Sequence, residues 1–573
     1  MNSKMPFIDV KLEVFFIWLT GCCFSVFLFL FNGLGLDFSD TQLFWTKVHL
    51  NHSLEFPYFT PAPCGGFLLG ADPNNTIFTS VQLVYAFVAD PFFAWRIALF
   101  LTSVVFAIGS VRLFRALGVR SQSAAVVGGW LLPLCGYWVA HGSAGHIAIL
   151  GISILPLLMV EAISLSTADY SDLRLFSLAW WSRVVRHGAM LFLLINSGHF
   201  WPLPALFLLG PIFVASGWKI FRERGLRELV LAISPVFFGA ILSLAMSALR
   251  FAAIFTFAVQ AFPRGVGMFG VIGDTRYLIV TMLRSLFDFT VITIGEPSGL
   301  LGGFWEWSAY MGLLSLPLGL IGIVSVKPKT KWFYCLLAAS VFQFVLTRTT
   351  HFGELIRTLV PALAEISWFY RGIIVHVFAA SFFVALGVDR LSRMTKLPIA
   401  AIVFCLLICD FAIVYIVSGT WSPVREPTVK LISMERVIAH EGPNQAIFGY
   451  NRVWCYNPIL GYKRENYQSQ VVNGLVLEEK TKGFYNMNDV RALFSPQGRT
   501  GIYRTEPWPL WPVADRKVLE QFLMFKQVNE LPPIFFWIRI ACIAGWVGFA
   551  VAVVAAGRAY LSKPEVVEAT RRI

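Results

Sequence analysis

The sequence predicts an all-α polytopic membrane protein with about twelve transmembrane helices and a small mixed α/β extramembrane segment near the C-terminus. Three observations predict this class. The chain is 57% hydrophobic and only 14% charged, whereas a soluble domain carries about 25% charged residues. Apolar runs of roughly 20 residues recur along it, the length that crosses about 30 Å of hydrocarbon. Lys and Arg fall mostly in short clusters between these runs, as the positive-inside bias produces.

The net charge of +13 therefore reflects membrane topology, and we expect no nucleic-acid partner. The first apolar run, Leu12–Leu36, follows only Lys4 and Lys11. It is too long for a signal peptide and no small-residue cleavage site follows it, so we expect it to remain as a helix.

Basic clusters set the predicted orientation. On the inner side we place Arg112/Arg115/Arg120, Arg174/Arg183/Arg186, Lys219/Arg222/Arg224/Arg227, Lys327/Lys329/Lys331, Arg390/Arg393/Lys396 and the chain from Arg558 onward. The later spans are then Phe92–Ser110, Ser123–Ala140, Ile147–Ile163, Gly188–Ser197, Phe200–Trp218, Leu229–Phe257, Ser308–Val326, Trp332–Leu346, Ile373–Val388, Leu397–Val417 and Pro533–Ala556. Both termini are predicted to be cytoplasmic.

The stretch Gly188–Trp218 must cross twice to keep its flanking basic clusters inside. Its first half is too short for a full span. A re-entrant hairpin buried in protein or lining a wet cavity would satisfy both conditions. The sequence Asn196-Ser197-Gly198-His199 would then lie at the tip of that hairpin.

This topology divides the chain into three parts. Residues 1–417 form a transmembrane module with outer loops 37–91, 262–307 and 348–372. Residues 418–532 form a small outer-face domain, and 533–573 form a final helix with a basic inner tail.

The small outer-face domain mixes strand and helix patterns. Strand-like pieces run over Gln445–Tyr450 and Gln468–Leu477, and a short helix is predicted to begin near Asp515 as its N-cap. Seven of the nine cysteines lie inside apolar spans, where they act as small hydrophobes. Whether Cys64 and Cys455, both in outer segments, form a disulfide is left open by their spacing. No CxxC pair or Cys/His cluster indicates a metal site, and we expect no cofactor.

Asp37 and Asp40 follow directly after the first span. Carboxylates beside hydrocarbon are costly unless they have a role or a partner. At a water–lipid boundary such a pair is a candidate general base. The alternative is that both residues cap a short interfacial helix.

Further polar groups gather on the predicted outer face. His146 and His199 each follow a glycine, and Glu306 lies between two tryptophans. The outer-loop arginines are Arg264, Arg276, Arg284, Arg348, Arg357 and Arg371. Arginine binds phosphate through a planar fork of donors, so these residues predict an anionic partner such as a lipid phosphate. The alternatives are packing histidines, arginines that reach lipid headgroups and an interfacial Glu306.

Two charged residues, Arg250 and Asp410, lie within spans near their outer ends. They either pair structurally or line a cavity. Outer-loop aromatics, among them Tyr370, are suited to stacking on the apolar face of a sugar ring.

The order of these motifs resembles bacterial members of the C-type membrane glycosyltransferase superfamily (GT-C). The motifs are the aspartate pair, Phe56-Pro57-Tyr58-Phe59-Thr60-Pro61, Gly145-His146, Gly198-His199, Trp305-Glu306-Trp307-Ser308-Ala309-Tyr310-Met311-Gly312 and Trp368-Phe369-Tyr370-Arg371-Gly372. The resemblance covers roughly Leu12 to Arg390. It departs from better-defined GT-C families, because a clean Glu-x-Asp, a paired Asp-Asp and a Trp-Trp-Asp signature are absent from the sequence.

The resemblance implies transfer of a sugar from a polyprenyl-phosphate carrier to a cell-envelope glycan or lipid acceptor on the outer face of a bacterial plasma membrane. Asp40 would be the catalytic base or acceptor-orienting group, with Asp37 as second candidate. Arg264, Arg276, Arg284 and Arg371 would hold the carrier phosphate. His146, His199, Glu306 and Tyr370 complete the predicted substrate-binding set.

Two other functions remain open. A flippase for a lipid-linked sugar would use the same outer residues without bond chemistry. It should carry charges near the midplane of several spans, and spans such as Ser123–Ala140 contain none. A non-catalytic subunit of an envelope polysaccharide assembly complex would tolerate changes at Asp40.

Overall fold

A computed structural model describes most of the helical part of the chain. The described residues are 10–32, 84, 87–88, 91–143, 146–168, 170, 173–197, 202–253, 286, 308–325, 331–347, 372–395, 397–418, 421, 479–481, 484–485, 511–512 and 534–561. In these ranges the chain is almost entirely helical, in agreement with the predicted fold class.

The first half of the bundle runs from the N-terminus to residue 253. Its elements are α1 (Val10–Ser25), the π-helical η1 (Val26–Leu30), α4 (Pro91–Ala116), α5 (Gln122–Leu134), α6 (Gly136–Ser143), the 3₁₀-helix η2 (Ile147–Ile154), α7 (Leu155–Leu165), α8 (Leu178–Asn196), α9 (Pro202–Arg224), α10 (Leu226–Met246) and α11 (Ala248–Ala253).

The second half adds five helices and a small sheet. These are α16 (Ser315–Ser325), α17 (Lys331–Thr347), α20 (Ile373–Met394), α21 (Ile399–Val417), β1 (Glu479–Thr481), β2 (Phe484–Tyr485), β3 (Trp511–Pro512) and α26 (Ile534–Leu561). The strands pair antiparallel in the order β1-β2-β3. They fall in the segment predicted as an outer-face domain. The strands predicted over 445–450 and 468–477, the helix near Asp515, Cys64 and Cys455 lie outside the described residues.

Eight helices of the described part are long and apolar enough to cross a membrane. Each of the twelve predicted spans coincides with helical structure, but several boundaries differ. The helical structure of the first span ends at Leu30, six residues before the predicted Leu36. The backbone bends at Phe31. The predicted span Leu229–Phe257 is interrupted at Ser247, where α10 gives way to the short α11.

The predicted span Gly188–Ser197 belongs largely to a longer helix, which is not among the eight described helices that are long and apolar enough to cross a membrane. Helix α8 begins ten residues earlier, at Leu178, and is 19 residues long. Its start is fixed by Ser177, whose hydroxyl accepts a hydrogen bond from the backbone N–H of Trp180. Helix α9 follows with 23 residues, so the short first half of the predicted hairpin is part of a 19-residue helix. The tip of that hairpin, Gly198-His199, lies outside the described residues.

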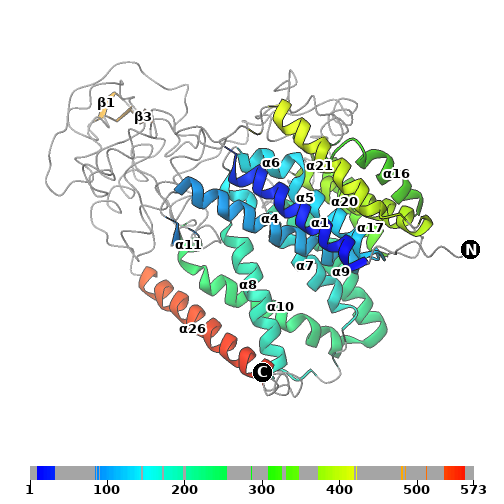
Figure 1. The fold of residues 1–573 in the computed structure, drawn as a ribbon. Coiled ribbons are helices and arrows are strands. Elements are labelled where there is room, and N and C mark those ends of the chain that lie inside the picture. Colours follow the sequence, from blue (N-terminus) through cyan, green and yellow to red (C-terminus); the bar gives the residue numbers. More distant parts are fainter. Residues whose placement is uncertain are drawn as a thin grey trace, which may run out of the picture.

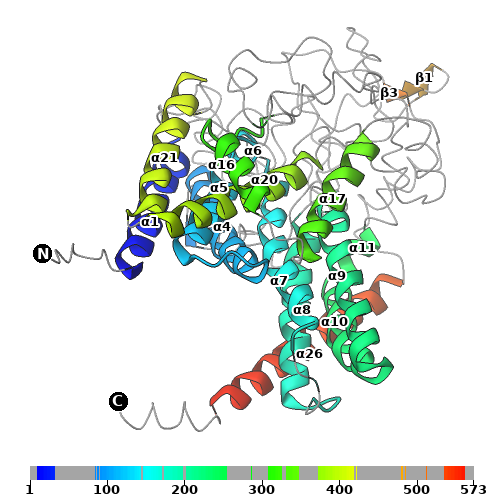
Figure 2. The same cartoon turned by 90° about the vertical axis from the view of Figure 1, so that its right-hand side faces the viewer.

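Helix α5 is the centre of the bundle. Every residue from Ser123 to Ser143 is buried, with α1, α4 and α20 packed around α5 (Figures 1 and 2). Small residues permit the close approach of these helices. A Cβ added to Gly21 of α1 would lie 2.4 Å from the Trp130 ring, and one added to Gly128 would lie 2.6 Å from Ala385 Cβ.

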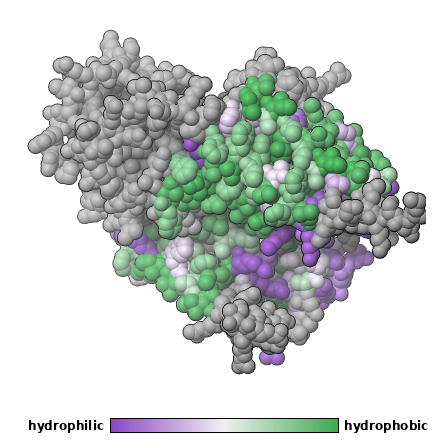
Figure 3. Space-filling view, viewed as in Figure 1, coloured by the Kyte–Doolittle hydropathy of each residue, from purple (hydrophilic) through white to green (hydrophobic). Residues whose placement is uncertain are grey.

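Helices α8, α10 and α26 form a second group below this centre in Figure 1. Helix α26 lies at its edge, and the larger part of its apolar surface is exposed. Figure 3 shows a broad apolar surface over the bundle, with hydrophilic residues gathered along its lower border. Large exposed apolar side chains such as Phe15 and Val324 are suited to contact with lipid.

The helix ends that the charge pattern places inside lie together. The Glu13 carboxylate accepts hydrogen bonds from Ser123 Oγ at 2.7 Å and from the Ala401 backbone N–H at 3.3 Å. Buried Asp389 accepts from the Ser121 N–H at 2.6 Å. These bonds join the starts of α1, α5 and α21 to the end of α20.

The same holds for the second helix group. Arg224 at the end of α9 donates to the Ala168 carbonyl. The Arg183 guanidinium lies 4.9 Å from the Tyr170 ring centroid. Burial raises the pKa of the Tyr170 phenol, and nearby Arg183 opposes that rise. The basic residues of α8 and α9 thus both contact the connection that follows α7. That these residues face the cytoplasm stays a prediction from the charge bias.

Candidate functional site

The described part of the chain includes one residue of the predicted site, His146. The others, Asp37, Asp40, His199, Arg264, Arg276, Arg284, Glu306, Tyr370 and Arg371, lie outside the described residues. Their roles stay predictions, so the site is built from the described residues nearest to them in the chain.

His146 caps the start of η2 and lies against His141 at the end of α6. Its backbone N–H donates to the His141 carbonyl at 2.9 Å. The two imidazoles meet through their Nδ1 atoms at 2.6 Å, so one ring must donate the proton and the other accept it. The Tyr137 ring packs edge-on against His141, with centroids 4.4 Å apart. His141 is fully buried, and this partner of His146 was not singled out from the sequence.

The segment at the end of the first span also contacts the end of α6. Asn32, which is buried, donates from Nδ2 to Ser143 Oγ at 2.9 Å. Trp95 of α4 donates from its indole N–H to the Gly142 carbonyl at 3.3 Å. We call Asn32, His141, Ser143 and His146 the outer polar cluster. It joins the end of η1 to the end of α6, and Asn32 precedes Asp37 by five residues.

A second polar group lies at the end of α8. Arg250, buried in α11, donates to the Asn196 carbonyl at 2.7 Å. Asn196 in turn donates from Nδ2 to Ser247 Oγ at 2.8 Å. Ser197 packs on η2 so closely that a Cβ added to Gly151 would lie 1.8 Å from its Oγ. Ser197, which directly precedes the predicted Gly198-His199 element in the sequence, therefore lies against η2, the helix that follows His146.

Asp410 of α21 holds the segment that follows Glu306 in the sequence. Both of its carboxylate oxygens accept from Tyr310 OH at 2.9 Å, and Oδ2 also accepts from the Leu313 N–H at 2.7 Å. The Tyr310 carbonyl accepts from the Gly136 N–H at 2.7 Å. Arg250 and Asp410 thus have different partners, which answers the question of whether they pair with each other.

Two more of the predicted outer loops are close in sequence to described residues that form hydrogen bonds. Met311 donates from its N–H to the carbonyl of Leu286, two residues after Arg284. At the start of α20, His376 Nε2 bonds to Gln343 Oε1 of α17. That contact lies five residues after Arg371. The described residues around these loops offer imidazoles, amides, hydroxyls and one buried guanidinium. No group of three or more His, Cys, Asp or Glu suited to a metal ion occurs among the described residues.

No family model matches this chain, and no curated protein matches it in sequence. Among solved structures, the crystal structure of the Archaeoglobus fulgidus oligosaccharyltransferase in complex with zinc and sulfate is similar, with a TM-score of 0.40 and 10% identity. The similarity covers 79% of this chain and 59% of that one. The chain thus spans less than two thirds of the structure that it matches.

Proposed function

We propose that this protein is a membrane glycosyltransferase of the GT-C kind. It transfers a sugar from a polyprenyl-phosphate carrier to a cell-envelope glycan or lipid acceptor at the outer face of a bacterial plasma membrane. The observation that supports this most directly is the outer polar cluster, because it lies where the chain enters the loop that carries Asp37 and Asp40.

The cluster gives that loop a fixed starting point. Its side chains are buried or half-buried and are hydrogen-bonded in two pairs, Asn32 with Ser143 and His141 with His146. Hydrogen bonds between buried polar side chains favour a single arrangement. Five extended residues span at most about 18 Å, so Asp37 is tethered to the cluster through Asn32. Glu306 is four residues before Tyr310, which Asp410 holds, and Arg284 is two residues before Leu286, whose carbonyl accepts from the Met311 N–H.

The proposed chemistry needs the residue types predicted for this end. A base must take the proton of the acceptor hydroxyl as it attacks the anomeric carbon. Positive charge must stabilise the phosphate that leaves. Asp40 is assigned the role of the base, with Asp37 as the second candidate. Stabilisation of the leaving phosphate is assigned to Arg264, Arg276, Arg284 and Arg371. His146 and His199, with Glu306 and Tyr370, orient the substrates. Arg250, buried at the same end, joins the phosphate-binding candidates.

The test uses membranes from a host that lacks the protein. Wild type, Asp40→Asn and Asp37→Asn are expressed at matched levels and supplied with radiolabelled polyprenyl-phosphate sugars. The control is Glu223→Gln, because Glu223 is a half-exposed carboxylate at the opposite end of the bundle. We expect wild type and Glu223→Gln to move label from the carrier to an acceptor. Asp40→Asn should be slower by about 10² or more, the usual contribution of a general base.

Three outcomes would argue against the proposal. Equal transfer by wild type and Asp40→Asn removes Asp40 from the mechanism, and loss in Asp37→Asn alone moves the base to Asp37. Absence of transfer from every donor, with carrier-linked sugar appearing on the opposite leaflet of reconstituted vesicles, supports the flippase. Absence of both activities in folded protein supports the assembly subunit.

A further inference from the structure

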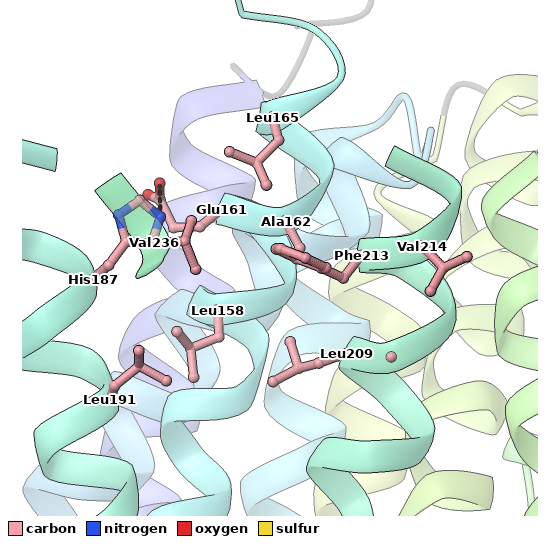
Figure 4. Close-up of a pocket in the computed structure, with 11 residues that line it drawn as sticks. Leu158, Glu161, Ala162, Leu165, His187, Leu191, Leu209, Phe213, Val214 and Val236 are labelled. Carbon is pink, nitrogen blue, oxygen red and sulfur yellow. Dashed lines mark ion pairs between the residues drawn. The ribbon is translucent and has the colours of Figure 1, made fainter. Parts of the chain in front are cut away.

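An apolar cavity of about 310 Å³ lies between α7, α8, α9 and α10, apart from the outer polar cluster (Figure 4). Nine of its eleven lining residues are apolar. They are Leu158, Ala162, Leu165, Leu191, Leu209, Gly210, Phe213, Val214 and Val236. The two polar lining residues, Glu161 and His187, lie together on one side of the cavity in Figure 4.

An ion pair holds the polar side of the cavity. Arg186 Nη2 lies 2.7 Å from Glu161 Oε2, and His187 Nε2 lies 3.7 Å from the same oxygen. The other His187 nitrogen, Nδ1, donates to the Arg183 carbonyl at 2.6 Å. The Glu161 side chain is only 16% exposed, whereas that of Arg186 is 53% exposed. Arg186 therefore neutralises the carboxylate and presents its remaining donors to the outside.

The cavity has an open side on the surface of α9, one of the candidate spans. Val214 lines the cavity and is 70% exposed. A Cβ built at Gly210, one turn earlier, meets no atom within 4 Å. Because the surface of a span faces hydrocarbon, the open side admits an apolar chain from the bilayer.

The charged residues on the helices around the cavity indicate which class of lipid it binds. The four helices around the cavity carry six basic residues, Arg183, Arg186, Lys219, Arg222, Arg224 and Arg227, against three acidic ones, Glu161, Glu223 and Glu228. All six basic residues belong to clusters predicted to be inside. Basic residues at a membrane surface attract anionic headgroups by about 1 kcal/mol each. We propose that the cavity binds one acyl chain of an anionic phospholipid of the inner leaflet, whose headgroup is held by Arg186 and its basic neighbours.

The test uses the full chain in vesicles of phosphatidylcholine that contain phosphatidylglycerol with a diazirine in the middle of one acyl chain. After photolysis, mass spectrometry locates the label. We compare wild type with Gly210→Leu, which adds an apolar side chain at a lining position where an added Cβ meets no atom within 4 Å. The control is Gly217→Leu, on the same helix, where an added Cβ makes only an ordinary contact of 3.7 Å with Leu229.

We expect label on buried Leu158, Glu161 or Ala162 of α7 in wild type and in Gly217→Leu, and at least a fivefold loss in Gly210→Leu. Exposed positions of α26, such as Ile543 and Val551, should be labelled in all three proteins. Unlabelled phosphatidylglycerol should reduce the labelling of α7 in a saturable way. This measurement tests the proposal on the wild-type protein alone.

Absence of α7 label in wild type, with α26 labelled, would overturn the proposal, as would α7 label that Gly210→Leu leaves unchanged. Equal competition by phosphatidylcholine would overturn the anionic headgroup. Stronger competition by a polyprenyl phosphate would overturn the phospholipid assignment in favour of a carrier tail. None of these outcomes depends on whether sugar transfer is observed.

Discussion

The hydrogen bond from Asn32 to Ser143 joins residues 111 positions apart and is buried. It is the described contact through which the end of the first helix is fixed to α6. A buried donor that loses its acceptor costs the free energy of its desolvation, about 1–3 kcal/mol. Loss of the Ser143 hydroxyl should therefore lower the free energy of unfolding.

Ser143→Ala tests that dependence. We expect the free energy of unfolding to fall by about 1–3 kcal/mol, seen as a lower thermal midpoint in detergent. The control is Ser164→Ala, because Ser164 Oγ donates only to the Glu161 carbonyl of its own helix. A midpoint for Ser143→Ala equal to that of the control would contradict the role given to this bond.

The contact between His141 and His146 predicts how substitutions at His146 change the rate of sugar transfer. An asparagine amide can still bond to the His141 ring, whereas a leucine cannot. If His146 orients substrate through this pair, His146→Leu should lose at least about tenfold in transfer rate, the effect of roughly 1.4 kcal/mol in positioning. His146→Asn should retain most of the rate. Equal rates for the two variants, at matched expression, would remove the pair from the site.

At this scale the sequence analysis singled out His146 but not its partners, and the role of His146 in the site stays a prediction. His141 lies in the same Gly-rich stretch, five residues earlier, and only the turn after α6 brings the two rings together. Asn32 fell inside the predicted first span, Leu12–Leu36, and was not singled out. Both are long-range or turn-dependent contacts, which hydropathy does not encode.

At the scale of elements, the tightest crossing is that of α16 with α20. A Cβ added to Gly322 would lie 1.9 Å from the Phe383 carbonyl oxygen, and one added to Gly387 would lie 2.0 Å from the Leu318 carbonyl oxygen. The two helix backbones approach because neither glycine has a side chain at the contact.

Gly322→Ala should therefore destabilise the protein although alanine is the better helix former. The neighbour is backbone and cannot rotate away, so we expect a cost of about 1–3 kcal/mol from overpacking. The matched control is Gly319→Ala on the same helix, where the nearest atom is Phe383 Cβ at 4.0 Å. Thermal midpoints of the two variants should differ in opposite directions from wild type. A Gly322→Ala midpoint at or above that of Gly319→Ala would contradict the close crossing.

Element boundaries show what sequence patterns miss. The start of α8 was placed ten residues too late because Arg183 and Arg186 interrupt its apolar run. In the structure these arginines bind Tyr170 and Glu161, which lie on other parts of the chain. Tertiary partners thus let a helix continue through residues that hydropathy treats as a break.

At the scale of the whole molecule, the charge clusters predicted which helix ends share a side, and the described hydrogen bonds agree. A cysteine placed at exposed Arg222, at the end of α9, should react with a membrane-impermeant maleimide only after the membrane is permeabilised. A cysteine at Asn75, in the predicted outer loop, should react in intact cells. The reverse pattern would invert the topology and move Asp37 and Asp40 to the cytoplasm.

The burial of α5 has a consequence for biosynthesis. Its Ser121 cap bonds to Asp389, 268 residues later in the chain, and α20 covers the Gly128 face. At about 5–20 residues per second, α20 emerges from the ribosome between about 13 and 54 seconds after α5, a delay that follows from this 268-residue separation. During that interval the future centre of the bundle faces lipid or an insertion chaperone. A chain arrested before α20 would therefore lack its core and be a substrate for membrane proteases.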